Sequence, residues 1–385
     1  MLPDERALVD LCVLVMDHPE SAPGFDASSE FLSSLPVQVM SVEGGVLLVR
    51  GVKEIYISGE NVEHLVNDVL TTASGSGVTR RDLIEKFAAT ERETVSKLID
   101  DLVSRSILVP PGNSPGGDAI ESGLEVFYWH FGRTATAAID SINRKRIAVL
   151  GVNSISRSMV SALRSIGVTN VKVVDFEILR NLRMRDSAGD LLPEEWKLES
   201  PLTYEEWSES LGQEEISCLV ATCDFGGTDL MLEWNRFCLE TGCHFLPVVQ
   251  DRFTGTIGPL VIPGESACYA CMLLRENSNI IAPAWERLAE SGAPHRQAVI
   301  GLHPAMTAVL GELAAMELCK LYGGGIPWYP SRLIEVNVLG PTIVSRTLLK
   351  LPMCPVCSPA LKTSSALLAT DSFVPGQALN FHDFR

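Results

Sequence analysis

Long apolar runs are missing from this 385-residue sequence. The longest ones, such as Ile147–Val152 and Phe245–Val249, have the length of strands, whereas a helix that spans a bilayer needs roughly 20 apolar residues. The first residues, MLPDERALVDLC, carry acidic side chains early and lack the basic segment and apolar core of a secretion signal. We therefore expect a cytoplasmic protein without a membrane span, whose ten cysteines are reduced thiols.

Basic residues are also scarce. Lys and Arg together number 31 against 48 Asp and Glu, which leaves a net charge of −17. Nucleic-acid binding needs clustered cations that release counterions from phosphates, so no nucleic-acid partner is expected. Catalytic motifs are absent as well: the sequence contains no H-E-x-x-H, no G-x-S-x-G and no P-loop, and its seven histidines are scattered.

The chain is long enough for at least two domains, because a single hydrophobic core rarely grows this large. Its hydrophobic fraction of 46% and charged fraction of 21% are those of a globular protein. The clearest linker runs from Pro110 to Gly117, where proline and glycine are concentrated. The predicted organisation is an N-terminal helical extension (1–34), a first domain (35–112), a linker and junction (113–145), a second domain (146–358) and a C-terminal tail (359–385).

The first domain combines three short strands with three helices. Tight turns at Glu43–Gly45 and at Gly51 separate the strands, as hairpins require. This order of elements is typical of a small winged-helix-like module, and a short helix is expected in the extension before it. The predicted strands are Val37–Val42, Gly45–Arg50 and Val52–Ser58, and the predicted helices start after Asn61, after Thr79 and at Glu91 (Glu91–Ile107), with the earlier helix at Glu5–Met16.

The second domain alternates apolar strands with helices, which predicts an α/β fold with a doubly wound parallel sheet. Its first strand, Ile147–Leu150, is apolar throughout and ends at Gly151. The long helix Pro304–Tyr322 stops at three consecutive glycines, and a late hairpin follows it. The other predicted elements are the helix Ser154–Ile166, the strands Asn170–Phe176, Ile216–Thr222 and His244–Gln250, and the hairpin strands Leu333–Leu339 and Thr342–Leu349.

Two C-x-x-C pairs form the strongest chemical motif. Cys268 and Cys271 make the first pair, Cys354 and Cys357 the second, and 82 residues lie between the pairs. Each pair can present two thiolates to one tetrahedral ion, so the two together predict a closed, structural zinc site that fastens the C-terminal segment to the core. A redox motif is the alternative, but it needs only one pair. The other six cysteines lie in apolar contexts and are predicted core thiols.

A second motif follows the strand Ile147–Leu150. A phosphate-binding loop would place glycines there so that backbone N–H groups can approach the ligand. Only Gly151 of the G-x-G-x-x-G pattern is present, and Asn153 and Ser156 occupy the other two glycine positions. Asp175, at the end of the next strand, stands where a ribose contact would lie, or is simply an acid in solvent. The loop alone therefore argues against nucleotide binding.

The segment RKRIAVLGVNSISRSMVSALRSIGVTNVKVVDFEILRNLRMRD nevertheless resembles the ubiquitin-activating/ThiF-like adenylating superfamily. Its members have a strand ending in Asp-x-Asp/Glu, here Asp175 and Glu177, and an Asn-Leu-x-Arg-like element, here Asn181–Arg183 with shorter spacing. Ala221–Phe225 stands in for the Thr-Asp-Asn segment of the family, with Phe225 where asparagine is expected. Paired C-x-x-C zinc knuckles are a hallmark of the same superfamily.

The first domain resembles the leader-peptide recognition element of ribosomal peptide natural-product pathways. Together with GPLVIPGESACYAC before the first knuckle, this order of modules resembles the ocin-ThiF-like family, the ThiF-like leader-binding partners of YcaO cyclodehydratases. The resemblance covers roughly residues 35–358. It implies a non-catalytic chain that binds the leader of a precursor peptide, for example of a bacteriocin, and presents it to the YcaO subunit that forms thiazoline or oxazoline rings. It also implies that ATP is bound by the YcaO subunit and not by this chain, and a homodimer is compatible with it.

The resemblance also assigns residues to two places. At the vestigial nucleotide site, Asn153 and Ser156 are then relaxed residues, and the site as a whole is Gly151, Asn153, Asp175, Arg183 and Asp224. An extended leader can add to the edge of a sheet that still has unpaired N–H and C=O groups. The third strand and third helix of the module frame that groove, and the predicted peptide-binding residues are Lys53, Ile55, Tyr56, Ile57, Lys97, Leu98, Asp101 and Arg105.

Alternatives stay open at this point. The strand and helix face could be an ordinary edge and a solvated surface. An ATP-dependent adenylating enzyme acting on a peptide is favoured by Asp175, Arg183 and Asp224. A winged-helix DNA-binding regulator fits the outline of the first domain, but residues 35–110 carry eight Lys and Arg against eleven Asp and Glu, which opposes phosphate binding.

Overall fold

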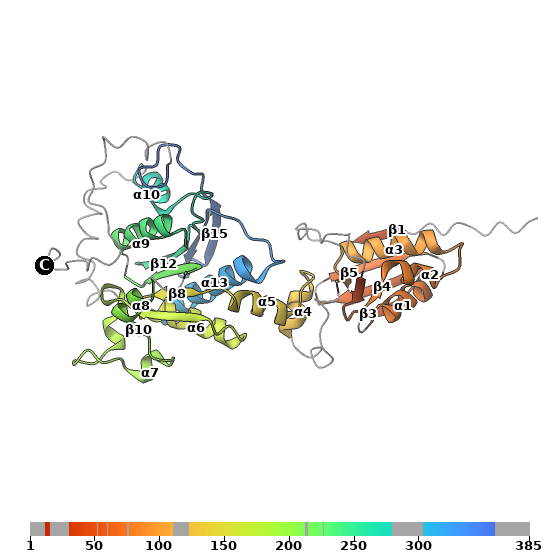
Figure 1. Cartoon of the computed structure of the whole chain (residues 1–385), viewed down its shortest axis with the longest axis horizontal. Coiled ribbons are helices and arrows are strands. Elements are labelled where there is room, and N and C mark those ends of the chain that lie inside the picture. Colours follow the sequence, from red (N-terminus) through yellow and green to blue (C-terminus); the bar gives the residue numbers. More distant parts are fainter. Residues whose placement is uncertain are drawn as a thin grey trace, which may run out of the picture. The chain divides into compact units, whose positions relative to one another are not determined.

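The computed structural model describes residues 12–15, 31–51, 53–59, 61–74, 77–110, 123–211, 215–225, 227–278 and 303–358. Two compact units share the chain: an N-terminal unit (Met1–Ser141 with Lys320–Pro327) and a C-terminal unit (Ile142–Cys319 with Trp328–Arg385). Figure 1 shows the elements of both. Most of the predicted linker (111–117) and the predicted tail (359–385) lie outside the described residues.

The N-terminal unit contains a four-stranded antiparallel sheet in the order β1-β5-β4-β3. β3 and β4 form a tight hairpin in which Val42 pairs with Gly45, and Gly44 adopts the positive φ of 78° that the turn needs. β5 pairs with β4 over its whole length. The strands are β1 (Cys12–Val15), β3 (Gln38–Val42), β4 (Gly45–Arg50) and β5 (Lys53–Ser58).

Three helices supply the core of this unit. Val66, Leu98 and Ile99 are fully buried and share one hydrophobic cluster with Ile55 and Ile57 of β5. The strands and helices expected between residues 35 and 112 are therefore present. The helices are α1 (Val62–Thr72), α2 (Arg80–Glu85) and α3 (Arg92–Ser104), and a small sheet adds β2 (Phe31–Ser34), β6 (Val78–Thr79) and β7 (Leu108–Val109), with α4 (Gly123–Trp129) and α5 (Ala135–Asn143) following.

The expected helical extension is wrong where the structure describes it. Cys12–Val15 form strand β1 instead of part of a helix at Glu5–Met16, and the remaining residues of that predicted helix lie outside the described part of the chain. Phe31–Ser34 form β2 between β6 and β7. The physical reason for β1 is that β5 offers unpaired N–H and C=O groups, while a segment rich in valine favours an extended backbone.

The C-terminal unit is built on an eight-stranded sheet in the order β10-β9-β8-β11-β12-β13-β14-β15. The strands from β10 to β12 are parallel, and the last three are antiparallel. β8 and β11 are completely buried, as their uninterrupted apolar sequences predict. The strands are β8 (Ile147–Leu150), β9 (Val171–Asp175), β10 (Leu202–Thr203), β11 (Cys218–Cys223), β12 (His244–Asp251), β13 (Thr254–Ile257), β14 (Arg332–Asn337) and β15 (Thr342–Thr347).

Helices cover both faces of this sheet, with α9 on one side and α6 on the other (Figure 1). Trp234 of α9 packs in one cluster with Ala148 and Leu150 of β8. α13 approaches α6 so closely that a Cβ on Gly311 would lie 2.7 Å from the Ile155 carbonyl oxygen. The helices are α6 (Ser154–Ser165), α7 (Pro193–Trp196), α8 (Tyr204–Ser210), α9 (Thr228–Thr241), α10 (Tyr269–Asn277) and α13 (Pro304–Gly323). The predicted α/β fold is confirmed, and no described helix has the length and apolarity needed to cross a membrane.

Candidate functional site

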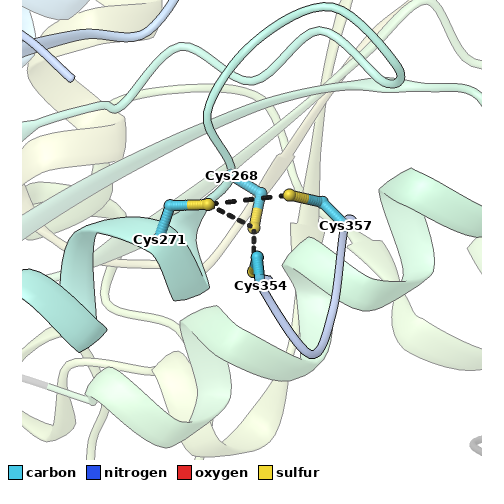
Figure 2. A group of neighbouring side chains, drawn as sticks. All are labelled: Cys268, Cys271, Cys354 and Cys357. Atoms are coloured by element: carbon cyan, nitrogen blue, oxygen red, sulfur yellow. Dashed lines mark hydrogen bonds between the residues drawn. The ribbon is translucent and has the colours of Figure 1, made fainter. Parts of the chain in front are cut away.

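The fold brings the two cysteine pairs together. Cys268 precedes α10 and Cys271 lies in its first turn, while Cys354 and Cys357 come from the segment after β15 (Figure 2). The Sγ atom of Cys268 is 3.8 Å from that of Cys271 and 3.7 Å from that of Cys354, and the Cys271 and Cys357 Sγ atoms are 3.6 Å apart. All four sulfur atoms lie within 4.8 Å of one another. The predicted four-sulfur cluster is therefore present.

The spacing of these sulfur atoms fits a tetrahedral metal ion. A zinc–sulfur bond of about 2.3 Å places the corners of a regular tetrahedron about 3.8 Å apart. Cys268, Cys271 and Cys354 are fully buried, so neighbouring side chains hold the thiols in place. Backbone contacts also fasten the second pair, because Lys350 Nζ donates to the Gly264 carbonyl oxygen at 2.8 Å and Arg275 donates to that of Leu349 at 3.0 Å. The cluster could hold one metal ion.

The remaining cysteines behave as the sequence predicts. Five of the six predicted core thiols are buried, and the side chain of Cys12 lies outside the described residues. Burial raises the pKa of the Cys223 thiol, so this thiol stays protonated and is a poor nucleophile. The buried thiols near the sheet are Cys218, Cys223, Cys238, Cys243 and Cys319.

The loop between β8 and α6 has a different character. Asn153 is the N-cap of α6, and its Oδ1 atom accepts hydrogen bonds from the Ile155 and Ser156 N–H groups, both at 3.1 Å. The Ser156 hydroxyl accepts from the Asn153 N–H at 3.1 Å, which completes a capping box. The Ser154 N–H donates to the Asp224 carboxylate. The first N–H groups of α6 are therefore all occupied by this chain's own side chains.

Asn153 also fastens the loop to the neighbouring strand. Its Nδ2 atom donates to the Thr222 carbonyl oxygen at 3.0 Å and to the Thr222 hydroxyl at 2.9 Å. Gly151 is required by this close approach, since its φ is +103° and a Cβ there would lie 2.7 Å from the Thr222 carbonyl oxygen. Asn153 and Ser156 are both fully buried. The prediction that these two positions are under no structural constraint is wrong, because both side chains cap the N-terminus of α6.

A cavity of about 250 Å³ lies beside this helix terminus. Asn181 donates to the Asp224 carboxylate at 2.6 Å, and burial is the main cause that raises the pKa of Asp224. Sequence reasoning identified Arg183 and Asp224 in this wall but missed Arg157, in the first turn of α6, and Thr307, which the packing of α13 brings there. The lining residues are Ser154, Arg157, Asn181, Arg183, Met184, Glu195, Asp224, Phe225, Pro304 and Thr307.

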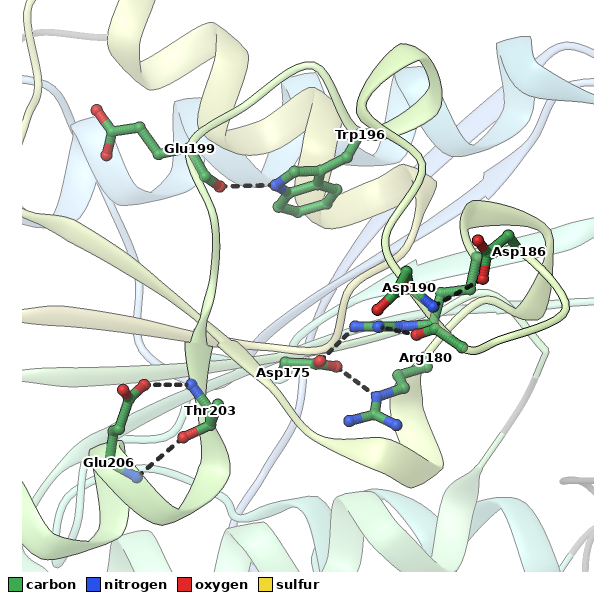
Figure 3. Close-up of polar contacts among 10 residues, drawn as sticks. Asp175, Arg180, Asp186, Asp190, Trp196, Glu199, Thr203 and Glu206 are labelled. Carbon is green, nitrogen blue, oxygen red and sulfur yellow. Dashed lines mark hydrogen bonds and ion pairs between the residues drawn. The ribbon is translucent and has the colours of Figure 1, made fainter.

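Asp175 is separate from that cavity. It is buried, and its carboxylate forms ion pairs with Arg180, at 2.7 Å, and with Arg185 (Figure 3). The alternative of a free acid in solvent is therefore wrong. Two guanidinium groups already satisfy the oxygen atoms that would otherwise contact a ribose.

The predicted peptide-binding residues fall into two groups. Ile55, Ile57 and Leu98 are buried in the core of the N-terminal unit. The others are more accessible and several have partners: Lys53 Nζ donates to the His130 carbonyl oxygen at 3.0 Å, and Lys97 pairs with Glu93 at 3.0 Å. Tyr56 donates through its hydroxyl to the Glu43 carbonyl oxygen at 3.2 Å, and Asp101 and Arg105 lie at the end of α3, half-buried.

Sequence reasoning missed the strand β1, which lies on the edge of β5. β1 pairs with β5 in antiparallel register, with Val13 opposite Ile57 and Leu14 opposite Tyr56. The edge that the sequence predicts to be free for a peptide is therefore occupied by residues 12–15. The short, continuous apolar run CVLV was the signal that could have identified a strand here.

Solved structures with this fold include E. coli MccB. Its complex with MccA-N7isoASN superimposes with a TM-score of 0.60 at 15% identity, covering 85% of this chain and 99% of that one. The complex of MccB with AMPCPP and MccA gives 0.57, also at 15% identity, with 85% and 100% covered. A heterocyclase in complex with substrate and cofactor gives 0.54 at 15% identity and covers 85% of this chain but 39% of that one. No family model and no curated protein matches the sequence. These likenesses show that this chain has the fold of MccB.

Proposed function

We propose that this chain is a non-catalytic, cytoplasmic subunit that binds the leader of a ribosomal precursor peptide and presents it to a separate YcaO cyclodehydratase. The single observation that carries the proposal is the occupied N-terminus of α6. An adenylating enzyme must offer these N–H groups to phosphate, whereas here the Asn153 side chain and the Asp224 carboxylate accept them. The occupied N–H groups therefore support a chain that has the fold of MccB but does not bind ATP itself.

The N-terminal unit supplies the proposed peptide site. A leader adds to β5 as an antiparallel strand, and its backbone pairing provides affinity with little sequence preference. Ile55, Ile57 and Leu98 lie in the core of this unit and hold β5 and α3 in place, whereas Lys53, Tyr56, Lys97, Asp101 and Arg105 supply the side-chain contacts to the leader. MccB, whose structures with MccA share this fold, and the heterocyclase with its substrate support a peptide partner for this chain as well.

The four-cysteine cluster has a structural part in this proposal. Zinc suits a set of four thiolates, and four sulfur ligands leave no position for a water molecule. The ion would be held by Cys268, Cys271, Cys354 and Cys357, and it would fasten the segment after β15 to α10. Its contribution is therefore to the stability of the C-terminal unit.

Fluorescence polarisation tests the peptide proposal. The probe is a labelled synthetic leader from the precursor peptide encoded beside this gene, titrated with the full chain, and the control is the same peptide scrambled. We expect the leader to bind at least about tenfold more tightly than the scrambled peptide, a difference of about 1.4 kcal/mol. Equal affinity for the two peptides would exclude leader recognition.

An active adenylating enzyme is the second candidate. The cavity that contains Arg183 and Asp224 favours it, and MccB with the same fold has been crystallised with ATP and with AMPCPP. ATP–pyrophosphate exchange by this chain, measured with the precursor peptide present, distinguishes the two functions. Our proposal requires exchange at the rate of a blank without protein, and exchange that disappears in Asp224→Asn would favour the enzyme instead.

A further inference from the structure

The edge of β5 is already paired within this chain. β1 pairs with β5 from Ile55 to Ser58, with Cys12 opposite Ser58 and Val15 opposite Ile55. The other edge of β5 is paired with β4 along its full length. Each backbone N–H and C=O group can complete the ladder in one direction only. A leader and β1 therefore cannot occupy β5 at the same time.

The pairing of β1 is short enough to be exchanged. β1 has four residues and one neighbour, β5, whereas β5 and β4 pair over six residues. Terminal strands with few partners open locally at low free-energy cost, while core strands open only with global unfolding. Because β1 belongs to the same chain, it also returns at a high effective concentration. β1 can therefore leave the edge of β5 at low free-energy cost and pair with it again.

We infer that residues 12–15 are an internal competitor that closes the peptide site on β5 until a leader displaces them. The inference rests on the proposed leader-binding function. The competitor lowers the affinity of every peptide by the fraction of molecules in which β5 is open. Peptides that offer only backbone pairing then fail to displace β1, and a leader with additional side-chain contacts succeeds. β1 also protects the edge of β5 from pairing with other chains.

The first experiment opens the site. In a strand, successive N–H groups point to opposite sides, so one of the N–H groups of Val13 and Leu14 must face β5. Val13→Pro combined with Leu14→Pro in the full chain removes that N–H whichever it is. The probe is a fluorescein-labelled peptide with the sequence of residues 9–18 and serine in place of Cys12. We expect the double variant to bind this probe about tenfold more tightly than the wild type, as for a site that is open in about a tenth of wild-type molecules.

A probe with proline at the positions of Val13 and Leu14 is the control, and it should bind neither protein. Equal binding of the first probe to variant and wild type would overturn the inference. That result would mean that β1 does not close this edge.

The second experiment locks the site without weakening the fold. Ser58→Cys places a cysteine at the register position opposite Cys12, and paired residues of antiparallel strands have a Cα separation of about 4.5–5.5 Å, which a disulfide accommodates. The oxidised protein should bind the leader at least about tenfold more weakly than the same protein after reduction, because a covalent link keeps β1 on β5. The matched control is Ser58→Cys with Cys12→Ser, which contains the other cysteines but cannot form this bond. Its leader affinity should not respond to oxidation.

The two experiments separate failure of this inference from failure of the proposed function. If the leader binds the wild type and the oxidised Ser58→Cys variant equally, leader binding stands and the competitor is wrong, with the exposed edge of β3 as the remaining place for a peptide. The double-proline variant could bind the peptide of residues 9–18 more tightly than the wild type does, while no variant binds any leader. In that case β1 closes the edge of β5, but the proposed leader-binding function is wrong. Loss of folded protein in the double-proline variant would make β1 a permanent strand and overturn the inference.

Discussion

The four-cysteine cluster and the N-terminus of α6 lie in the same unit, and a short sequence motif marks each of them. At the cluster, all four sulfur atoms converge at the spacing of a metal-ion shell. At the helix terminus, the donors that a phosphate would need are taken by Asn153 and Asp224. The comparison teaches that two short motifs in one unit can have opposite outcomes: one gathers side chains around a position that suits a metal ion, and the other uses its side chains to cap a helix.

The largest expected effect is at the cluster. Cys354→Ser removes one sulfur ligand from a fully buried position, and the metal ion is expected to be lost with it. We expect about one zinc per chain in the wild type and almost none in the variant by elemental analysis. The loss should destabilise the C-terminal unit by about 4 kcal/mol, which lowers its melting temperature by about 10 °C.

Cys319→Ala is the matched control for this prediction. It removes a buried thiol outside the cluster, so it should retain the zinc and cost only about 1–2 kcal/mol of stability. Full stability and full zinc content in Cys354→Ser would contradict the structural role of the cluster.

A smaller effect is expected at the helix terminus. Asn153→Ala removes the acceptor of two N–H groups and the donor to Thr222 from a fully buried place, so the free energy of unfolding should fall by about 2–4 kcal/mol. Urea denaturation measures this change. Ser154→Ala, the adjacent position, should change the free energy by less than about 0.5 kcal/mol. If Asn153→Ala were as stable as Ser154→Ala, the polar contacts of Asn153 would not be what fills this site.

The acid beside the helix terminus predicts a pH dependence. Burial raises the pKa of Asp224 in the folded state above its ordinary value of 3.8, so the folded chain binds this proton more tightly than the unfolded chain does. The stability of the wild type relative to Asp224→Asn is therefore highest below 3.8 and declines as the pH rises through the raised pKa. Chemical denaturation of the two proteins from pH 4 to pH 7 measures the difference. A difference that stays constant, or that changes in the opposite direction, would exclude a raised pKa.

The sequence predicted some parts of this molecule well because their signals are local. A short apolar run that ends at a glycine, such as Ile147–Leu150 before Gly151, is typical of a buried strand, and C-x-x-C spacing lets two thiolates reach one ion. The ends of the chain were harder, since Cys12–Val15 form a strand only because β5 provides an edge for them. Asn153 was interpreted only as the replacement of a glycine in a phosphate-binding loop. The pattern Asn-x-x-Ser at residues 153–156 is also a helix-capping pattern, and that is its role here. Thr307 reaches the cavity through the tertiary packing of α13, which no local pattern encodes.

The smallest expected effect tests whether the cavity has kept any function. Arg183 is exposed at its rim, so Arg183→Ala should change the free energy of unfolding by less than about 0.5 kcal/mol. Leader affinity should also be unchanged, because Arg183 belongs to the C-terminal unit and the proposed peptide site to the other. The measurement is heterocycle formation on the precursor peptide, with this chain and the YcaO subunit combined. Lys97→Ala, on the proposed peptide site, is the comparison and should weaken leader binding while leaving stability nearly unchanged, since its ion pair with Glu93 is exposed. If Arg183→Ala instead slows heterocycle formation while leader affinity stays constant, the cavity acts in the reaction, and the contrast between a four-cysteine site that can hold an ion and a helix terminus that only caps itself does not hold.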